Sequence, residues 1–298
     1  MAEAQKYPVP IPFLVLSAAT AYAVLALYLQ VISADWFLQD DFAFLVEVQR
    51  TWSWREVFLP LERRFWWAYR PLGMETYFYL CFKLFGWNAG GFFGVTLAAH
   101  VLTALVLYRV ARQLGLDLLA AVSAALLAVS RFPSITNVTP ACTFHYPAAI
   151  LLHLLALSLF LDYTRTRRLA FQLGACGCFA SGLLCNELVI NLPFLLVLAS
   201  LFAADFPIRA RTLARALRDS VPYFALAVLF LIVRYQVIAE VERPHLYILE
   251  LGWHLPLNAF VHLSMVAGNH LYLAASLALM ALLAVGINNP AHLNSFLL

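Results

Sequence analysis

The amino-acid sequence predicts an all-α polytopic membrane protein, and three observations point to this fold class. Hydrophobic residues make up 63% of the 298 residues and charged residues only 12%, about half of the roughly 25% that is usual in soluble domains. The mean hydropathy is +0.82. The apolar residues gather in runs close to the roughly 20 residues that a helix needs to cross a bilayer. We therefore expect a single membrane domain over residues 1–298.

Eight apolar runs are expected to form a bundle of about eight transmembrane helices. The first, at 12–32, is long enough to span and should act as an uncleaved anchor. A helical core follows over 91–238, and an outer loop and last helix occupy 239–298. The seven later runs lie at 91–108, 118–132, 148–161, 169–185, 188–204, 221–238 and 271–287.

The arginines between these runs predict the orientation of the chain. Three connections hold nine arginines against four acidic residues, and all three face one side of an eight-helix arrangement. The positive-inside rule makes that side cytoplasmic. The long segment 34–88 is then an extracytoplasmic loop of amphipathic helices at the membrane surface. The nine residues are Arg109, Arg112, Arg165, Arg167, Arg168, Arg209, Arg211, Arg215 and Arg218.

The stretch 71–85 within that loop is apolar enough to resemble a further span, but it holds Glu75 and Lys83. Each charge at the bilayer centre costs about 2.5 to 3.5 kcal/mol on insertion scales. We therefore expect an interfacial or half-inserted helix here, and whether it spans is left open.

Two adjacent carboxylates, Asp40 and Asp41, precede a helix that is expected from the apolar spacing of Phe42, Leu45 and Val48. An aspartate at such a place is a favoured N-cap and needs no other function. Adjacent carboxylates at a membrane surface also suit a general base, or a base together with a ligand for a divalent cation or a hydroxyl group. Both interpretations stay open, and a divalent cation is the one candidate cofactor.

Five further residues are candidates for substrate binding. Arg63, Arg64 and Arg70 alternate with aromatic residues, and their guanidinium groups suit either a phosphate or lipid headgroups. Glu187 lies in a turn between two apolar helices, where it needs a partner or water. His145 lies on the expected outer side. The net charge of +3, spread over short loops, argues against nucleic acid as a partner.

Several motifs occur in a recognisable order: QDDFAFL, YRPLGMETYFYLCFKLFGWN, AAHVLTALVLYRV and CNELVINLP. This order resembles that of the membrane-embedded GT-C glycosyltransferases. The likeness covers about residues 12–205. It is greatest to the branch that holds protein O-mannosyltransferases, lipid A aminoarabinose transferases and tetratricopeptide-linked mannosyltransferases.

The resemblance implies roles for particular residues. Asp40 and Asp41 match the acidic pair of the family, Arg70 its basic-Pro-apolar motif, and Glu187 the glutamate of its small-Lys-Glu motif. Three positions depart from the family pattern. They are Asn186 in place of the lysine, Phe132 in place of the histidine of a His-Pro pair, and Asn137 where the branch often has glutamate.

The function implied is an inverting transfer of a sugar from a polyprenyl-phosphate carrier to an acceptor hydroxyl, with Asp40 or Asp41 as the catalytic base. Asp40 is preferred because it matches the leading acid of the family pair, and Asp41 would then orient the acceptor or hold a divalent cation. The implied place is the extracytoplasmic face of the inner (cytoplasmic) membrane. The implied partners are the carrier-linked sugar donor, membrane lipid, and an acceptor glycan, lipid or protein. The alternative is a non-enzymatic membrane protein, either a carrier-lipid flippase or transporter or a degenerate GT-C scaffold with a structural role.

Overall fold

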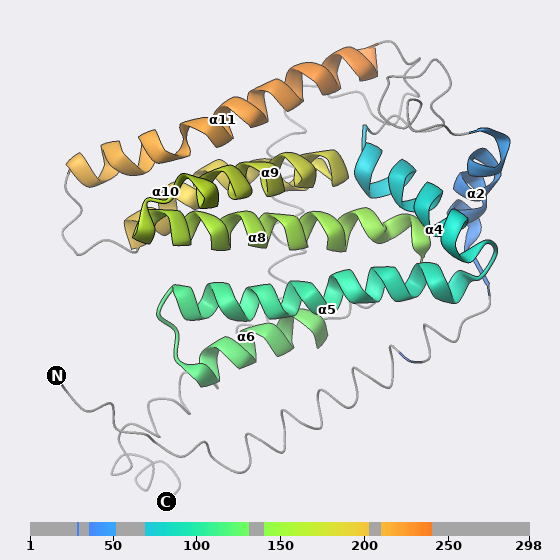
Figure 1. Ribbon diagram of the computed structural model, residues 1–298, viewed down its shortest axis with the longest axis horizontal. Helices are drawn as coiled ribbons and strands as arrows, with labels where there is room; N and C mark the ends of the chain where they lie inside the picture. Colours follow the sequence, from blue (N-terminus) through green and yellow to red (C-terminus); the bar gives the residue numbers. More distant parts are fainter. Residues whose placement is uncertain (1–28, 30–35, 52–68, 131–139, 203–209, 240–298) are drawn as a thin grey trace, which may run out of the picture. The chain divides into compact units, whose positions relative to one another are not determined.

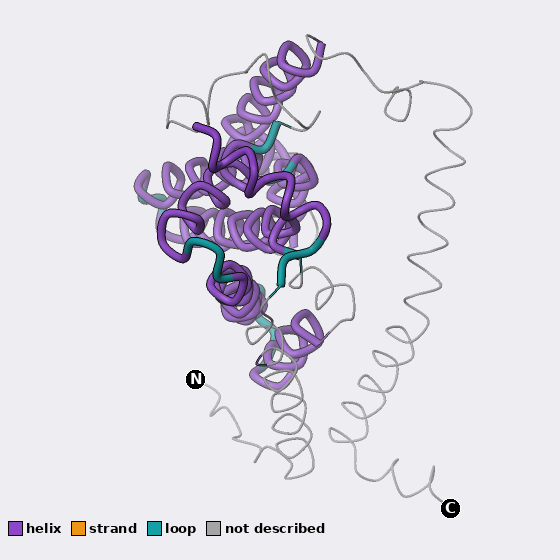
Figure 2. Tube along the Cα trace, turned by 90° about the vertical axis from the view of Figure 1, so that its right-hand side faces the viewer, coloured by secondary structure: helices purple, strands orange, loops and turns teal. Residues whose placement is uncertain are grey.

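The protein is helical throughout the part of the chain that the computed structural model describes. All regular structure there is α, 3-10 or π helix, and Figure 2 shows the helices joined by short loops. The predicted all-α fold class is therefore confirmed. The expected first and last membrane helices, 12–32 and 271–287, lie outside the described residues. These are 29, 36–51, 69–130, 140–202 and 210–239.

All the described residues belong to one compact unit, Met1–Val241. The expected single domain over 1–298 stays a prediction.

Within the described part of the chain, three helices are long and apolar enough to cross a membrane. They are α5 (Ala89–Gln113), α8 (His145–Thr166) with the 3-10 turn η2 (Ala141–Phe144) before it, and α11 (Ala210–Ala239). Shorter helices are α6 (Leu118–Ser130), α9 (Leu169–Cys185) and α10 (Leu192–Phe202). Six of the expected spans overlap these six helices. The count of eight spans stays a prediction.

The longest helices pack side by side. α8 lies between α5 and α9 in Figure 1 and contacts both, while α6 packs against α5 and α11 against α9 and α10. The core among α8 to α11 is apolar, and its largest fully buried side chains are Phe160, Phe179, Leu192, Leu196 and Tyr223. Large apolar side chains are also exposed, as suits helices that face lipid tails. They include Leu105, Leu173, Phe194 and Leu229.

The glycines of α9 explain how closely this helix approaches its neighbours. A Cβ at Gly174 would lie 3.3 Å from Leu159 of α8, and one at Gly182 would lie 3.5 Å from Leu152 of the same helix. Both glycines therefore face α8, and their lack of a side chain lets α9 and α8 approach closely. A Cβ at Gly177 would meet no atom within 4 Å.

The first described helix, α2 (Gln39–Thr51), buries an aromatic face. Phe44 stacks on Phe78 with ring centroids 4.8 Å apart, and Leu45 and Val48 are buried beside it. The sequence analysis placed Phe42 on this face, and that was wrong, because Phe42 is 48% exposed. Asp41 is fully buried instead, and the rotation of about 100° per residue turns position 42 outward.

The stretch 71–85 forms one continuous helical segment. It begins as a π-helix, η1 (Pro71–Thr76), and continues as α4 (Tyr77–Phe85). The Tyr77 hydroxyl donates to the carbonyl of Phe92 in α5, at 2.9 Å. The segment packs against α8 and α9 through η1 and against α2 and α5 through α4. Its place relative to the membrane stays a prediction.

Candidate functional site

The site is built around Arg70, whose side chain is mostly buried, with 17% of it exposed. Arg70 immediately precedes η1, and Pro71 begins that helix, where its missing N–H costs nothing. The guanidinium group makes a forked contact with Glu187. Its Nε donates to Oε2 at 3.0 Å and its Nη2 to Oε1 at 2.9 Å. Such paired contacts fix the orientation of both groups.

Glu187 opens the 3-10 helix η3 (Glu187–Asn191), which joins α9 to α10. Asn186 before it has extended backbone, and its side chain caps η3 by accepting from the N–H of Leu188 at 3.0 Å. This cap turns the chain sharply after α9. The carboxylate of Glu187 therefore points toward η1 and α11 rather than continuing along α9.

A second arginine reaches the same carboxylate from α11. Arg234 Nη2 donates to Glu187 Oε1 at 3.0 Å, with 26% of the arginine side chain exposed. Burial by itself raises the pKa of Glu187. The hydrogen bonds and charge of Arg70, together with the charge of Arg234, outweigh burial and lower that pKa from 4.5 to about 2. Glu187 is therefore ionised at neutral pH.

His145, the first residue of α8, completes the group. Its Nε2 lies 3.0 Å from Arg70 Nη1, and its Nδ1 lies 2.8 Å from the carbonyl of Cys142. An arginine can only donate, so Nε2 must be the acceptor, and the proton is then on Nδ1, which donates to the carbonyl. His145 is neutral in this arrangement. We call Arg70, His145, Glu187 and Arg234 the Arg70 cluster.

Gly73 lets η1 approach the cluster. A Cβ at this position would lie 2.6 Å from the carbonyl oxygen of Cys185 and 2.6 Å from Cβ of His145. No larger residue fits between η1, α8 and α9 without separating them. The contact brings Arg70 close to residues that lie 75 and 117 positions later in the chain.

The two aspartates differ sharply in their surroundings. Asp41 is fully buried and accepts three backbone N–H groups, from Leu38 at 3.0 Å, Ala141 at 3.1 Å and Cys142 at 2.7 Å. It therefore joins α2 to η2 directly ahead of His145. Asp40 is exposed and forms no hydrogen bond or ion pair with the described residues. Of the two carboxylates, Asp40 is the one with free lone pairs.

The structure thus brings together three residues that the sequence selected, Arg70, His145 and Glu187. Asp41 connects to them through Cys142, whereas no contact joins Asp40 to them. Arg63 and Arg64 lie outside the described residues. Sequence analysis missed Arg234, although a cation inside the apolar run 221–238 is a usable signal, since such a charge needs a partner.

The cluster carries a net positive charge, because two arginines face one carboxylate and a neutral histidine. Two buried donors, Nε of Arg234 and Nδ2 of Asn186, also have no hydrogen-bond partner among the described residues. Buried donors of this kind favour an incoming acceptor. The described residues contain no group of three acidic, histidine or cysteine side chains arranged for a metal ion. The use of a divalent cation stays a prediction.

The chain matches no protein-family model, no curated protein and no solved structure. The likeness to GT-C enzymes therefore rests on the sequence motifs alone. The chemistry of the site rests on its geometry, which suits the binding of an anion by Arg70 and Arg234.

Proposed function

We propose that the chain is a glycosyltransferase that moves a sugar from a polyprenyl-phosphate carrier to an acceptor hydroxyl at the extracytoplasmic face of the cytoplasmic membrane. The observation that carries this proposal is the Arg70 cluster, in which two guanidinium groups converge on a single carboxylate. The excess positive charge and the unpartnered Nε of Arg234 suit a phosphate.

In the proposed reaction, the acceptor oxygen attacks the anomeric carbon as the bond from that carbon to the phosphate oxygen breaks. The configuration inverts, and the carrier phosphate leaves with an additional negative charge. Arg234 and Arg70 would stabilise that developing charge, while Glu187 keeps Arg70 in a fixed orientation. Asp40 would take the proton of the acceptor hydroxyl, since Asp41 is committed to three backbone N–H groups.

The alternative is a non-enzymatic membrane protein, and one observation favours it. The forked Arg70–Glu187 pair satisfies both partners, as an ion pair that only joins η1 to η3 would do. If the protein is a degenerate GT-C scaffold with a structural role, Arg70 and Arg234 would contact no carrier phosphate, and Asp40 would be a surface residue. If it is a carrier-lipid flippase or transporter, the arginines would contact the phosphate but no sugar would be transferred.

Replacement of the aspartates separates these functions. The full-length protein in liposomes is supplied with radiolabelled polyprenyl-phosphate sugars, and release of polyprenyl phosphate is measured. Asp40→Asn should lower turnover by about 10² to 10⁴, the range for loss of a general base, with an unchanged melting temperature. Asp41→Asn should instead lower the free energy of unfolding by about 1 to 3 kcal/mol, because an amide NH₂ would face a backbone N–H.

The same preparation tests the phosphate contact. Arg234→Gln should weaken binding of a polyprenyl phosphate by about 10- to 150-fold, corresponding to about 1.5 to 3 kcal/mol for a charge-assisted contact. Binding of the matching polyprenol should not change. Arg211→Gln, at the exposed opposite end of α11, is the control. Normal turnover by Asp40→Asn would exclude this residue as the base. Equal affinity for phosphate and alcohol in the unaltered protein would favour the structural scaffold. Preference for the phosphate without sugar transfer would favour the flippase or transporter.

A further inference from the structure

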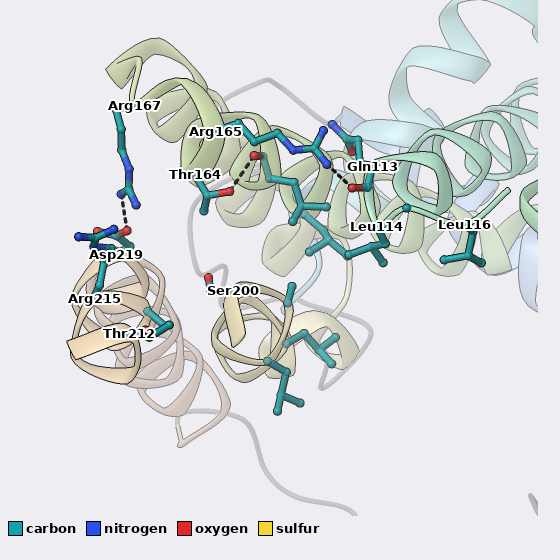
Figure 3. Close-up of a pocket in the computed structure, with 17 residues that line it drawn as sticks. Gln113, Leu114, Leu116, Thr164, Arg165, Arg167, Ser200, Thr212, Arg215 and Asp219 are labelled. Atoms are coloured by element: carbon teal, nitrogen blue, oxygen red, sulfur yellow. Dashed lines mark hydrogen bonds and ion pairs between the residues drawn. The ribbon is translucent and has the colours of Figure 1, made fainter. Parts of the chain in front are cut away.

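A cavity of about 970 Å³ lies at the end of α8 that is remote from the Arg70 cluster. Figure 3 shows the side chains around it, which come from the ends of α5 and α8, from α10 and from the first turns of α11. Its volume is at the upper end of the roughly 300–1,000 Å³ of small-molecule sites.

The cavity and the Arg70 cluster occupy opposite ends of the same two helices. At about 1.5 Å per residue, the path along α8 from His145 in the cluster to Thr164 at the cavity is about 28 Å. The path along α11 from Arg234 to Arg215 has about the same length. Both are close to the roughly 30 Å thickness of a bilayer core. The cavity is therefore a separate site, near the opposite membrane surface if α8 and α11 span.

The interior of the cavity is lined by aliphatic side chains. Leu157 and Leu161 come from α8, and Leu195, Leu198 and Ala199 come from α10. Leu161 is buried, whereas Leu198 is 49% exposed. The apolar lining thus continues from the interior to the outer surface of α10. A hydrocarbon chain can pack along such a surface and remove it from water, whereas a small polar solute would leave the apolar side chains without a partner.

The mouth of the cavity is cationic. Three arginines and one acidic residue line it. The acid, Asp219, is 5% exposed and forms ion pairs with Arg167 and Arg218, so it does not neutralise the others. Among the described residues, Arg165 donates only to the backbone carbonyl of Gln113, and Arg215 forms no ion pair. Two positive charges are left for a ligand.

We propose that this cavity binds the phosphate headgroup of an anionic membrane lipid. Arg165 and Arg215 contact the phosphate, and Leu195 and Leu198 contact the first part of an acyl chain. Under the predicted orientation this lipid belongs to the cytoplasmic leaflet, which carries anionic lipids. The binding is independent of the proposed glycosyl transfer, because it uses the other end of the helices.

The test measures single-lipid binding by native mass spectrometry of the full-length protein in neutral detergent, where no charged bilayer surface contributes. Phosphatidylglycerol is the probe, and phosphatidylcholine with the same acyl chains and inorganic phosphate are the comparisons. The double variant Arg165→Gln/Arg215→Gln should bind phosphatidylglycerol at least about tenfold more weakly, because the loss of even one charge-assisted contact costs about 1.5 kcal/mol. The matched control, Arg168→Gln/Arg211→Gln, removes the same charge outside the cavity and should change binding less than about twofold.

A second variant leaves the charges in place and fills the cavity. Ser200→Phe puts a ring where Figure 3 shows the small Ser200 side chain, and it should lower phosphatidylglycerol binding at least about tenfold. Melting temperatures check that each variant folds. Equal binding of phosphatidylcholine, an equal effect of the control variant, or unchanged binding in Ser200→Phe would each overturn the proposal. Displacement of the lipid by an equal concentration of inorganic phosphate would show a site for free anions instead.

Discussion

Glu187 is the residue on which the charges of the site depend. Its carboxylate accepts from Arg70 and Arg234, and only 22% of its side chain is exposed. Two guanidinium groups that both contact the same carboxylate oxygen are close enough to repel each other, unless an anion lies between them. Glu187 supplies that anion in the free protein. An anionic ligand would share this role when it binds.

This arrangement predicts a specific dependence of stability on pH. The pKa of Glu187 is lowered from 4.5 to about 2 in the folded protein, so its ionised form stabilises the fold above pH 4.5. That stabilisation, roughly 3 kcal/mol, is lost as the pH falls from 4.5 to about 2. Thermal unfolding of the protein and of Glu187→Gln, compared from pH 7 to pH 3, measures it.

The difference in melting temperature between the two proteins should be constant from pH 7 to pH 5 and should shrink below pH 4.5. Comparison of the two cancels the titration of the other carboxylates. A difference that stays constant down to pH 3 would show that Glu187 is not held as an ionised partner of the arginines.

Residue types identified part of this site in advance. Glu187 was selected because a charge between apolar helices needs a partner or water. Arg70 was selected because its guanidinium group suits a phosphate, and His145 because it lies on the expected outer side. Arg234 could not be assigned to them from its position alone, since a sequence does not show which helix ends meet. The contrast between Asp40 and Asp41 also required the structure, because it depends on the backbone N–H groups of η2, 100 residues later.

At the scale of elements, η1 decides whether Arg70 reaches its partners. This π-helix contacts α8 and α9 at Gly73, where a side chain would meet backbone atoms. π-Helical turns are rare and occur often at functional sites, because the wider turn displaces the residues on either side of it. Arg70 is the residue immediately before this π-helix.

Gly73→Ala should therefore separate η1 from the cluster. The added methyl group would be 2.6 Å from the oxygen of Cys185, and overpacking of this kind costs about 1 to 3 kcal/mol in the free energy of unfolding. Gly177→Ala in α9 is the matched control. With no atom within 4 Å of its Cβ, it should be neutral or stabilising by up to about 1 kcal/mol.

The free energy of unfolding of both glycine variants is measured by denaturation in detergent. Binding of polyprenyl phosphate is the second measurement. The proposed function requires Gly73→Ala to weaken that binding as well, because Arg70 moves. Equal stability of the two variants would show that η1 can shift without cost.

The apolar runs of the sequence predicted where these helices occur but not where they begin. α8 starts at His145 rather than at residue 148, and α11 starts at Ala210 rather than at 221. The first turns of α11 are rich in arginine, and Pro222 lies inside the helix, so hydropathy and the usual effect of proline both suggest a boundary there. The buried contacts of Ala216 and Tyr223 outweigh that local preference.

At the scale of the whole molecule, arginines lie at both ends of α11. Arg234 is in the Arg70 cluster, and Arg215 is at the mouth of the cavity. Val221, Val228, Leu229 and Ile232 lie on α11 between these two arginines, and all four are exposed. This distribution suits a protein that crosses a bilayer and meets phosphate groups at both surfaces.

Labelling at the two ends of α5 tests this placement. Asn88 precedes the helix and Leu116 follows it, and both are exposed. In a variant without native cysteines, Asn88→Cys should react with a membrane-impermeant maleimide in intact cells. Leu116→Cys should react only after the cells are opened. The opposite result would reverse the predicted orientation, and equal reaction in intact cells would show that α5 does not span.

The ion pair between Arg70 and Glu187 also has a consequence for biosynthesis. The two residues are 117 positions apart. At about 5 to 20 residues per second, the ribosome adds Glu187 about 6 to 23 s after Arg70. Throughout that interval the guanidinium group lacks its final partner, and it must stay hydrated or in contact with lipid phosphates. The ion pair between η1 and η3 therefore forms only after Glu187 has been synthesised, so the docking of these two elements is a late step of assembly.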